Sequence, residues 1–172
     1  MNSIFHKLLK AVPWFILLCL LTVSDQLSKF FIINEFSDGR EVKLLSDIFV
    51  IKVVYNYGAA FGMLTNKRWF FIIIAVIVLI GFFFIFFAIP KEKKYLLLKI
   101  AIVMLGAGAL GNMIDRIYLG YVRDFLYFKL INFPIFNFAD ILIVVASFLF
   151  IFLVCFYYKD SDLKKITFKK DI

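Results

Sequence analysis

Aspartates are the residues of this 172-residue sequence that could carry chemistry. The single histidine, His6, lies near the N-terminus, far from the candidate aspartates, which excludes a Ser-His-Asp or Cys-His arrangement and a His-ligated metal site. Cys19 and Cys155 lie inside apolar runs, where thiols behave as small hydrophobes and cannot build a disulfide framework. Two neighbouring aspartates share one proton, so the charged one can deprotonate a water while the neutral one polarises a carbonyl. The best candidates for such a pair are Asp124 and Asp140.

The elements that position these aspartates must lie in a membrane. Hydrophobic residues make up 64% of the chain and the mean hydropathy is +0.97, against roughly 45–50% apolar residues in a soluble domain. A chain of this size cannot hide so much apolar surface in one core, so a water-soluble globule is excluded. The net charge of +8 is therefore interpreted by its position relative to the membrane and not as a sign of nucleic-acid binding.

Four stretches have the length of about 20 apolar residues that a spanning helix needs: 11–33, 69–89, 95–117 and 138–158. The first could be a cleavable signal peptide, but no small-x-small cleavage site follows, and we treat it as a retained span. Eleven Lys and Arg residues lie on the side of the termini, including a basic tail at 159–172, and seven lie in the longer loops opposite. This asymmetry predicts cytoplasmic termini. The whole chain, 1–172, is expected to form one polytopic domain.

Two longer segments, 34–68 and 118–137, then lie on the outer face. Within the first, residues 48–55 form a β-branched and aromatic run that is followed by a turn signal at Asn56, Tyr57 and Gly58. We therefore expect a small β-rich segment on the outer leaflet. In the second segment, Phe133 and Pro134 should end any extended piece before the fourth helix.

Ionisable residues inside a membrane bundle are costly, so each one requires an explanation. The helix directions place the unusual polar residues of this chain in one layer at the outer interface. These are Asp25, Lys29, Asn56, Asn112, Asp115, Arg116, Asp124, Asn137 and Asp140. The sequence thus predicts four transmembrane helices with a carboxylate-rich outer pocket.

Each of these residues also has a purely structural interpretation. Asp25 and Lys29 are spaced for an ion pair within one helix. Asp115, Arg116 and Asn112 could form a buried network that joins the third helix to its neighbours. Asp140 follows Asn137 by three residues, as in a helix cap, and Asp124 could be a solvated charge in a loop. Gly106, Gly108 and Gly111 most simply allow close helix packing.

Five sequence blocks, in this order, resemble the signature of lipoprotein signal peptidase, also called signal peptidase II. They are DQLSK at 25–29, NYGAAF at 56–61, GALGNMIDR at 108–116, VRDF at 122–125 and FNFAD at 136–140. The resemblance covers roughly residues 20–145. Two departures are visible: Ala107 precedes Gly108 where the family usually has paired glycines, and Ile141 replaces a serine that often follows the last aspartate.

The resemblance implies a bacterial aspartyl peptidase of the cell membrane that cuts diacylglyceryl-modified prolipoproteins just before the lipidated cysteine. It implies that Asp124 and Asp140 are the catalytic dyad and that the outer β-rich segment is a cradle over the active site. It assigns eight further residues to the pocket and to substrate binding, namely Asp25, Lys29, Asn56, Gly58, Asn112, Asp115, Arg116 and Asn137. Membrane lipids and globomycin-type inhibitors are the other expected partners, and neither a cofactor nor a metal is expected.

Two other interpretations use the same aspartates. A small proton-coupled carrier or channel subunit would use intramembrane carboxylates as relays, but between the inner surface and Asp25 the chain offers only Lys99. A presenilin-type protease would require Gly-x-Gly-Asp in a helix, and here Gly108 is followed by Ala109. Both patterns fit this sequence less well than that of signal peptidase II.

Overall fold

The computed structural model describes residues 2–58 and 64–166 of the chain. Within these residues, four helices are long and apolar enough to cross a membrane. They are α1 (Asn2–Phe36), α2 (Arg68–Ala88), α3 (Leu96–Tyr118) and α4 (Phe138–Phe152), the last continued by one π-helical turn, Leu153–Tyr157. These helices confirm the predicted fold class and lie within a few residues of the predicted spans, except that α1 begins earlier.

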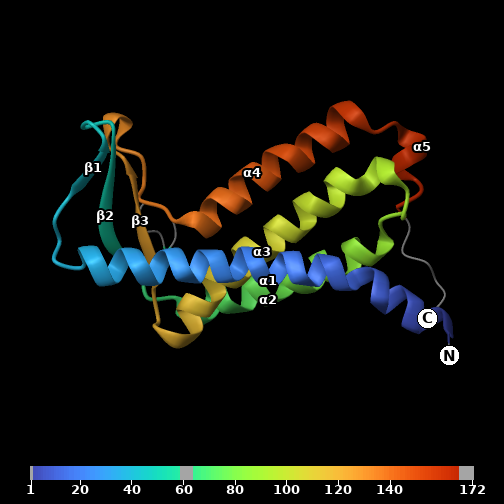
Figure 1. Ribbon diagram of the computed structural model, residues 1–172, viewed down its shortest axis with the longest axis horizontal. Helices are drawn as coiled ribbons and strands as arrows, with labels where there is room; N and C mark the ends of the chain where they lie inside the picture. The colour runs from blue at the N-terminus through green and yellow to red at the C-terminus, as the bar shows by residue number, and fades with distance from the viewer. Residues whose placement is uncertain (1, 59–63, 167–172) are drawn as a thin grey trace.

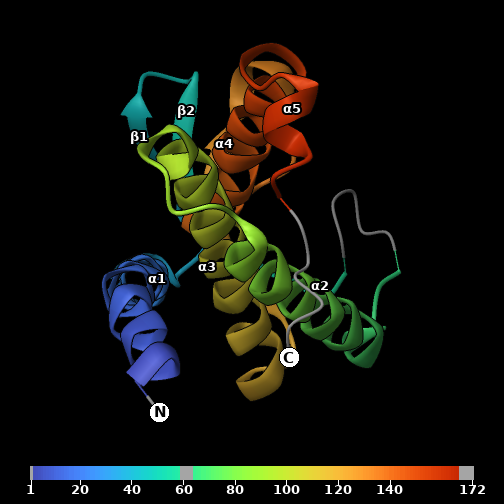
Figure 2. The same cartoon turned by 90° about the vertical axis from the view of Figure 1, so that its right-hand side faces the viewer.

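Helix α3 is the central helix, and α1, α2 and α4 pack around it (Figure 2). The other three helices carry many exposed large hydrophobic side chains, as expected for surfaces that face lipid. Gly108 explains how closely α3 approaches α4. A Cβ on this residue would lie 2.6 Å from the carbonyl oxygen of Ala139, a distance that real Cβ contacts essentially never show. The expectation that Gly108 allows close helix packing is confirmed.

A three-stranded antiparallel sheet stands at one end of the bundle (Figure 1). Its strands are β1 (Val42–Leu45), β2 (Phe49–Asn56) and β3 (Val122–Phe128), in the order β1-β2-β3. The register pairs Val54 with Asp124 and Asn56 with Val122, with an irregularity between Ile51 and Val54. Pairing thus places the end of β2 beside the start of β3.

The third strand corrects the sequence prediction, which confined the β-rich segment to residues 34–68 and placed Asp124 in a loop. Residues 122–128 carry two charges and no clean alternation of apolar side chains, so their pattern alone does not indicate a strand. These residues form a strand because they pair with the apolar strand β2. The short extended bridge between Leu126 and Phe136 then leads the chain toward α4, with Pro134 between them as expected for a segment that ends before the helix.

The opposite end of the bundle is closed by a short helix, α5 (Asp160–Leu163) (Figure 1). Asp162 caps this helix, pairs with Lys94 and accepts a hydrogen bond at its backbone oxygen from the Tyr95 hydroxyl. The rings of Tyr95 and Tyr158 stack with centroids 5.2 Å apart. Part of the predicted basic tail is therefore a packed helix, and residues 167–172 of that tail lie outside the described residues.

Candidate active site

A groove of about 1020 Å³ lies between the sheet and the adjoining ends of α3 and α4. Six of the residues that the sequence indicated line it: Asn56, Gly58, Asn112, Arg116, Asp124 and Asp140. Apolar side chains of α4 continue the lining away from them, among them Ile141, Val144 and Val145. One hollow thus combines two aspartates with a hydrophobic wall. Residues 59–61 of the second sequence block lie outside the described residues.

Asp124 reaches the groove from β3 and is only 3% exposed. Its Oδ2 accepts a hydrogen bond from Nδ2 of Asn56 at 2.8 Å, and its Oδ1 accepts one from Nδ2 of Asn137 at 2.6 Å. Burial, with the nearby Asp140 carboxyl as the second cause, raises the pKa of Asp124 to about 7, against the two amide hydrogen bonds. This aspartate is therefore not the solvated loop charge of the structural interpretation, and it is able to hold a proton at neutral pH.

Asp140 enters the groove from the first turn of α4. Its Oδ2 accepts a hydrogen bond from the backbone N–H of Asn137 at 3.0 Å, while Oδ1 of Asn137 accepts one from the backbone N–H of Asp140 at 3.1 Å. This reciprocal pair is a capping box, as the spacing predicted. Oδ1 of Asp140 accepts a further hydrogen bond from Nδ2 of Asn112 at 2.8 Å. The cap fixes the carboxyl at the positive end of the helix dipole.

Asn112 connects this carboxyl to a buried lysine. Its Oδ1 accepts hydrogen bonds from Nζ of Lys29 at 2.9 Å and from Nδ2 of Asn137 at 3.1 Å. Because an ammonium only donates, it must face the amide oxygen, and the amide nitrogen is then turned toward Asp140. Lys29 thus sets the orientation of the Asn112 side chain.

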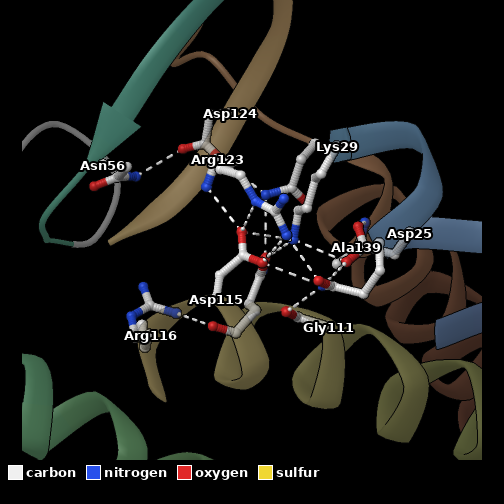
Figure 3. A network of polar contacts seen from close by, with 12 residues as sticks. Asp25, Lys29, Asn56, Gly111, Asp115, Arg116, Arg123, Asp124 and Ala139 are labelled. Carbon is white, nitrogen blue, oxygen red and sulfur yellow. Dashed lines mark hydrogen bonds and ion pairs between the residues drawn. The ribbon is translucent and has the colours of Figure 1, made fainter. Parts of the chain in front are cut away.

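Behind the groove lies a buried cluster of charges drawn in Figure 3. Nζ of Lys29 lies 2.8 Å from Oδ2 of Asp25 and 3.4 Å from Oδ2 of Asp115, and all three side chains are fully buried. The predicted ion pair of Asp25 and Lys29 is therefore present. Oδ1 of Asp25 also accepts a hydrogen bond from the backbone N–H of Ala139 at 2.9 Å, so the pair joins α1 to the first turn of α4. Gly111 makes room for it, because a Cβ there would lie 2.4 Å from Oδ2 of Asp25.

The expected network of Asp115, Arg116 and Asn112 is corrected in its pairing. Asp115 pairs with Arg123 of β3 and with Lys29, and the Arg116 side chain has other partners. The guanidinium of Arg116 donates to the carbonyl oxygens of Gly58 at 3.0 Å and Asn112 at 3.4 Å, and lies over the Phe71 ring at 4.7 Å. Adjacent residues of an α-helix point about 100° apart, so Asp115 and Arg116 face different neighbours.

Sequence reasoning missed two residues of the cluster, Gln26 and Arg123. Nε2 of Gln26 donates to Asp25, to the carbonyl oxygen of Gly111 and to Asp115 at 3.0–3.2 Å. Its Oε1 accepts a hydrogen bond from Arg123 at 2.7 Å. An available signal was the position of Gln26 beside Asp25 in an otherwise apolar helix. Arg123 gave no such signal, because only the strand pairing brings it to the helices.

Comparisons with known proteins point to one family. A family model described as signal peptidase (SPase) II matches residues 17–156. The lipoprotein signal peptidase of Brevibacillus brevis is 40% identical over 134 residues, which cover 77% of this chain and 89% of that protein. The lipoprotein signal peptidase of Clostridioides difficile is 35% identical over 144 residues, covering 83% and 95%.

Two solved structures, both of bacterial membrane enzymes studied by the in meso method, share the fold. One matches with a TM-score of 0.75 and 31% sequence identity and covers 93% of each chain. The other has a TM-score of 0.74 and 32% identity, and covers 85% of this chain and 94% of its own. The protein is thus a multi-pass bacterial membrane protein that belongs to the signal peptidase II family, the aspartic endopeptidases that cleave the signal peptides of prolipoproteins.

Proposed function

We propose that Asp124 and Asp140 are the catalytic dyad and that they hydrolyse the peptide bond just before the lipidated cysteine of a diacylglyceryl-modified prolipoprotein. The observation that carries this assignment is the position of Asn137 between the two carboxyls. Its side-chain nitrogen donates to Asp124, while its backbone N–H and its side-chain oxygen bind Asp140. Both carboxyls line the same groove.

The two aspartates have different surroundings, which suggests different roles. The raised pKa of Asp124 favours its neutral form, which donates a proton to the carbonyl oxygen of the scissile bond. Asp140, capped at the start of α4, is the base. It takes a proton from water as the water oxygen bonds to the carbonyl carbon. The proton on Asp140 then passes to the amide nitrogen, one hydroxyl of the resulting diol returns its proton to Asp124, and the C–N bond breaks. The products are a carboxylic acid and the free amine of the lipidated cysteine.

The remaining site residues divide by their positions. Asn56, Gly58, Asn112 and Arg116 line the groove, and we assign them to binding the peptide around the scissile bond. The others support the dyad from behind: Asp25, Lys29, Asp115 and Asn137, all of them buried. Support of this kind holds the reacting groups in place before substrate arrives.

The apolar wall of the groove suits the lipid part of the substrate. Ile141, Val144 and Val145 lie on α4, and a smaller hollow formed with Phe148 and Ile151 continues from Val144 along the same helix. Acyl chains or a signal helix would bury apolar surface there on entering sideways from the membrane. Membrane lipids and globomycin-type inhibitors are the other proposed occupants. The departure at Ile141 adds to this apolar wall.

The proposed reaction uses the two carboxyl groups as acid and base, and it needs no metal or organic cofactor.

We also propose the orientation that the Lys and Arg distribution favours, with cytoplasmic termini and the sheet and groove on the outer face of the cell membrane. A substrate whose lipid lies in the outer leaflet would then meet the groove directly.

The test uses the purified protein in detergent with a diacylglyceryl-modified prolipoprotein. Asp124→Asn and Asp140→Asn should each abolish cleavage while folded yield and substrate binding remain, because amide and carboxyl have nearly the same shape. The double variant should be hardly worse than either single one, since the two residues act as a unit. Asp47→Asn is the matched control, because Asp47 is exposed in the turn between β1 and β2, where it pairs with Lys43.

Two results would contradict the proposal. One is substantial cleavage by either dyad variant. The other is activity that disappears with a chelator and returns with a divalent metal, because the proposed reaction uses carboxyl groups alone.

A further inference from the structure

Arg123 and Asp124 are neighbours on β3, and their side chains point to opposite sides of the strand (Figure 3). Asp124 faces the groove and Asn56. Arg123 faces the buried charge cluster, does not line the groove, and has a side chain that is 16% exposed. One short piece of strand therefore carries a proposed catalytic carboxyl on one side and a buried cation on the other.

The contacts of Arg123 attach β3 to two helices. Its Nη2 donates to Oδ1 of Asp115 on α3 at 2.6 Å, and its Nε donates to Oδ2 of the same residue at 3.1 Å. The backbone N–H of Arg123 also donates to that Oδ2, at 3.0 Å. Nη2 also donates to Oε1 of Gln26 on α1 at 2.7 Å. A guanidinium can make this two-point contact with a carboxylate and a lysine cannot, so the contact fixes direction as well as distance.

Arg123 also balances charge in the cluster. Two carboxylates, Asp25 and Asp115, face two cations, Lys29 and Arg123. Arg123 donates hydrogen bonds to both oxygens of Asp115. Nζ of Lys29 donates to Asp25 and to the amide oxygen of Asn112, and it lies farther from Asp115, at 3.4 Å. Without Arg123 the Lys29 ammonium would be the one cation left to balance the two carboxylates with which it already pairs, and its hydrogen bond to Asn112 would compete with a closer contact to Asp115.

We propose that Arg123 is a positioning residue for the dyad. It holds the start of β3 on α1 and α3, so that Asp124 lies over the groove. By balancing Asp115, it also lets Lys29 keep the hydrogen bond that orients Asn112 toward Asp140. This inference rests on the proposed roles of Asp124 and Asp140. The proposed role requires no contact between Arg123 and substrate.

The test compares Arg123→Gln, Arg123→Lys and the control Arg40→Gln in the full-length protein, with kcat and KM expressed per folded molecule. Arg40 is a matched control because it pairs with acidic groups at an exposed surface. Arg123→Gln should lower kcat by about 10- to 100-fold, the scale expected when a reacting group is misplaced. KM should change by less than about threefold, because Arg123 does not line the groove. Arg40→Gln should leave both constants unchanged.

The pH profile separates the charge of Arg123 from its geometry. Asp124 is faced by the charges of Asp140 on α4, Lys29 on α1 and Arg116 on α3. Loss of a cation from the cluster behind them disfavours the carboxylate form, so in Arg123→Gln the alkaline limb of kcat/KM should move to higher pH by roughly 0.5 unit. Arg123→Lys keeps the charge but loses the two-point contact, so kcat should fall while the alkaline limb stays in place.

A purely structural role would give a different result. The inference is overturned if Arg123→Gln reduces only the folded yield, with wild-type kcat and alkaline limb in the folded fraction, or if it raises KM alone. If Arg123→Gln does not fold, Arg123→Lys decides, and a wild-type kcat in that variant overturns the inference. Activity in the Asp124→Asn or Asp140→Asn variants would overturn the proposed function itself, whereas their inactivity beside a normal Arg123→Gln overturns this inference alone.

Discussion

Asn56 donates a hydrogen bond from Nδ2 to Oδ2 of Asp124 at 2.8 Å, from the last residue of β2 to the neighbouring strand β3. The register makes them diagonal neighbours, because Asn56 pairs with Val122 and Val54 with Asp124. The same Asn56 side chain accepts a hydrogen bond from the backbone N–H of Gly58 at 2.9 Å. The turn after β2 therefore fixes the amide that faces the proposed catalytic acid.

Replacing Asn56 by alanine should shift the pH dependence of cleavage. The amide stabilises the charged form of Asp124, so its loss raises the pKa of Asp124 further above its ordinary value. If neutral Asp124 is the acid, the alkaline limb of kcat/KM lies near pH 7 in the wild type and should move to higher pH by roughly 0.5–1 unit in the variant. Rates measured from pH 4 to pH 10 check this. Asn34→Ala, at an exposed position of α1, is the control. A limb that moves to lower pH would contradict the assignment of Asp124 as the acid.

Asp25→Asn should lower the stability of the fold more than it alters the chemistry. The substitution leaves the buried ammonium of Lys29 with less compensating charge, and breaking a buried ion pair costs about 3–5 kcal/mol. The measurements are folded yield and thermal unfolding in detergent, with Asp38→Asn as an exposed control. A variant with normal folded yield and thermal stability but without cleavage would instead place Asp25 among the catalytic residues.

Three glycine substitutions should separate packing at the site from helix propensity. Gly111→Ala places a methyl group 2.4 Å from Oδ2 of Asp25, so the ion pair must move, and strain of about 1–3 kcal/mol is expected. Gly81→Ala on α2 meets nothing within 4 Å and should be neutral or stabilising by about 1 kcal/mol. In Gly106→Ala the new methyl group meets only Cδ1 of Leu18 at 3.3 Å, so the stability of this variant should lie between those of the other two. Thermal unfolding gives the order, and a Gly111→Ala variant as stable as Gly81→Ala would show that the α1–α3 contact can relax.

The helices and the convergence of the aspartates could be predicted because both follow from the membrane as solvent. Apolar length gives the spans, and the helix directions then bring Asp25, Asn112 and Asp140 to one end of the bundle. Local spacing also predicted the Asp25–Lys29 ion pair and the Asn137–Asp140 cap, since both lie within one element. The roles of Asp124 and Asp140 rested on the family resemblance as well.

Partners on different elements could not be predicted. The pairing of Asp115 with Arg123 requires a strand that the local pattern of 122–128 does not indicate, and that strand forms by pairing with β2. Gln26 bridges α1, α3 and β3, so its role depends on three packings at once. Hydropathy and spacing carry no information on such contacts, because these depend on how separate segments meet.

The orientation of the protein can be tested with single cysteines at Asp38 and at Lys93. Both positions are exposed: Asp38 lies between α1 and β1, and Lys93 lies between α2 and α3. Figure 1 shows these two connections at opposite ends of the molecule. Cys19 and Cys155 are free and exposed on their helices, so both must first be replaced. If the sheet faces the outside, as the Lys and Arg distribution favours, an impermeant thiol reagent added to intact cells should label only the cysteine at position 38. Both cysteines should react after the membrane is permeabilised, which controls for accessibility. Labelling at position 93 but not at position 38 in intact cells would reverse the orientation, and the groove would then face the cytoplasm, away from a lipid anchored in the outer leaflet.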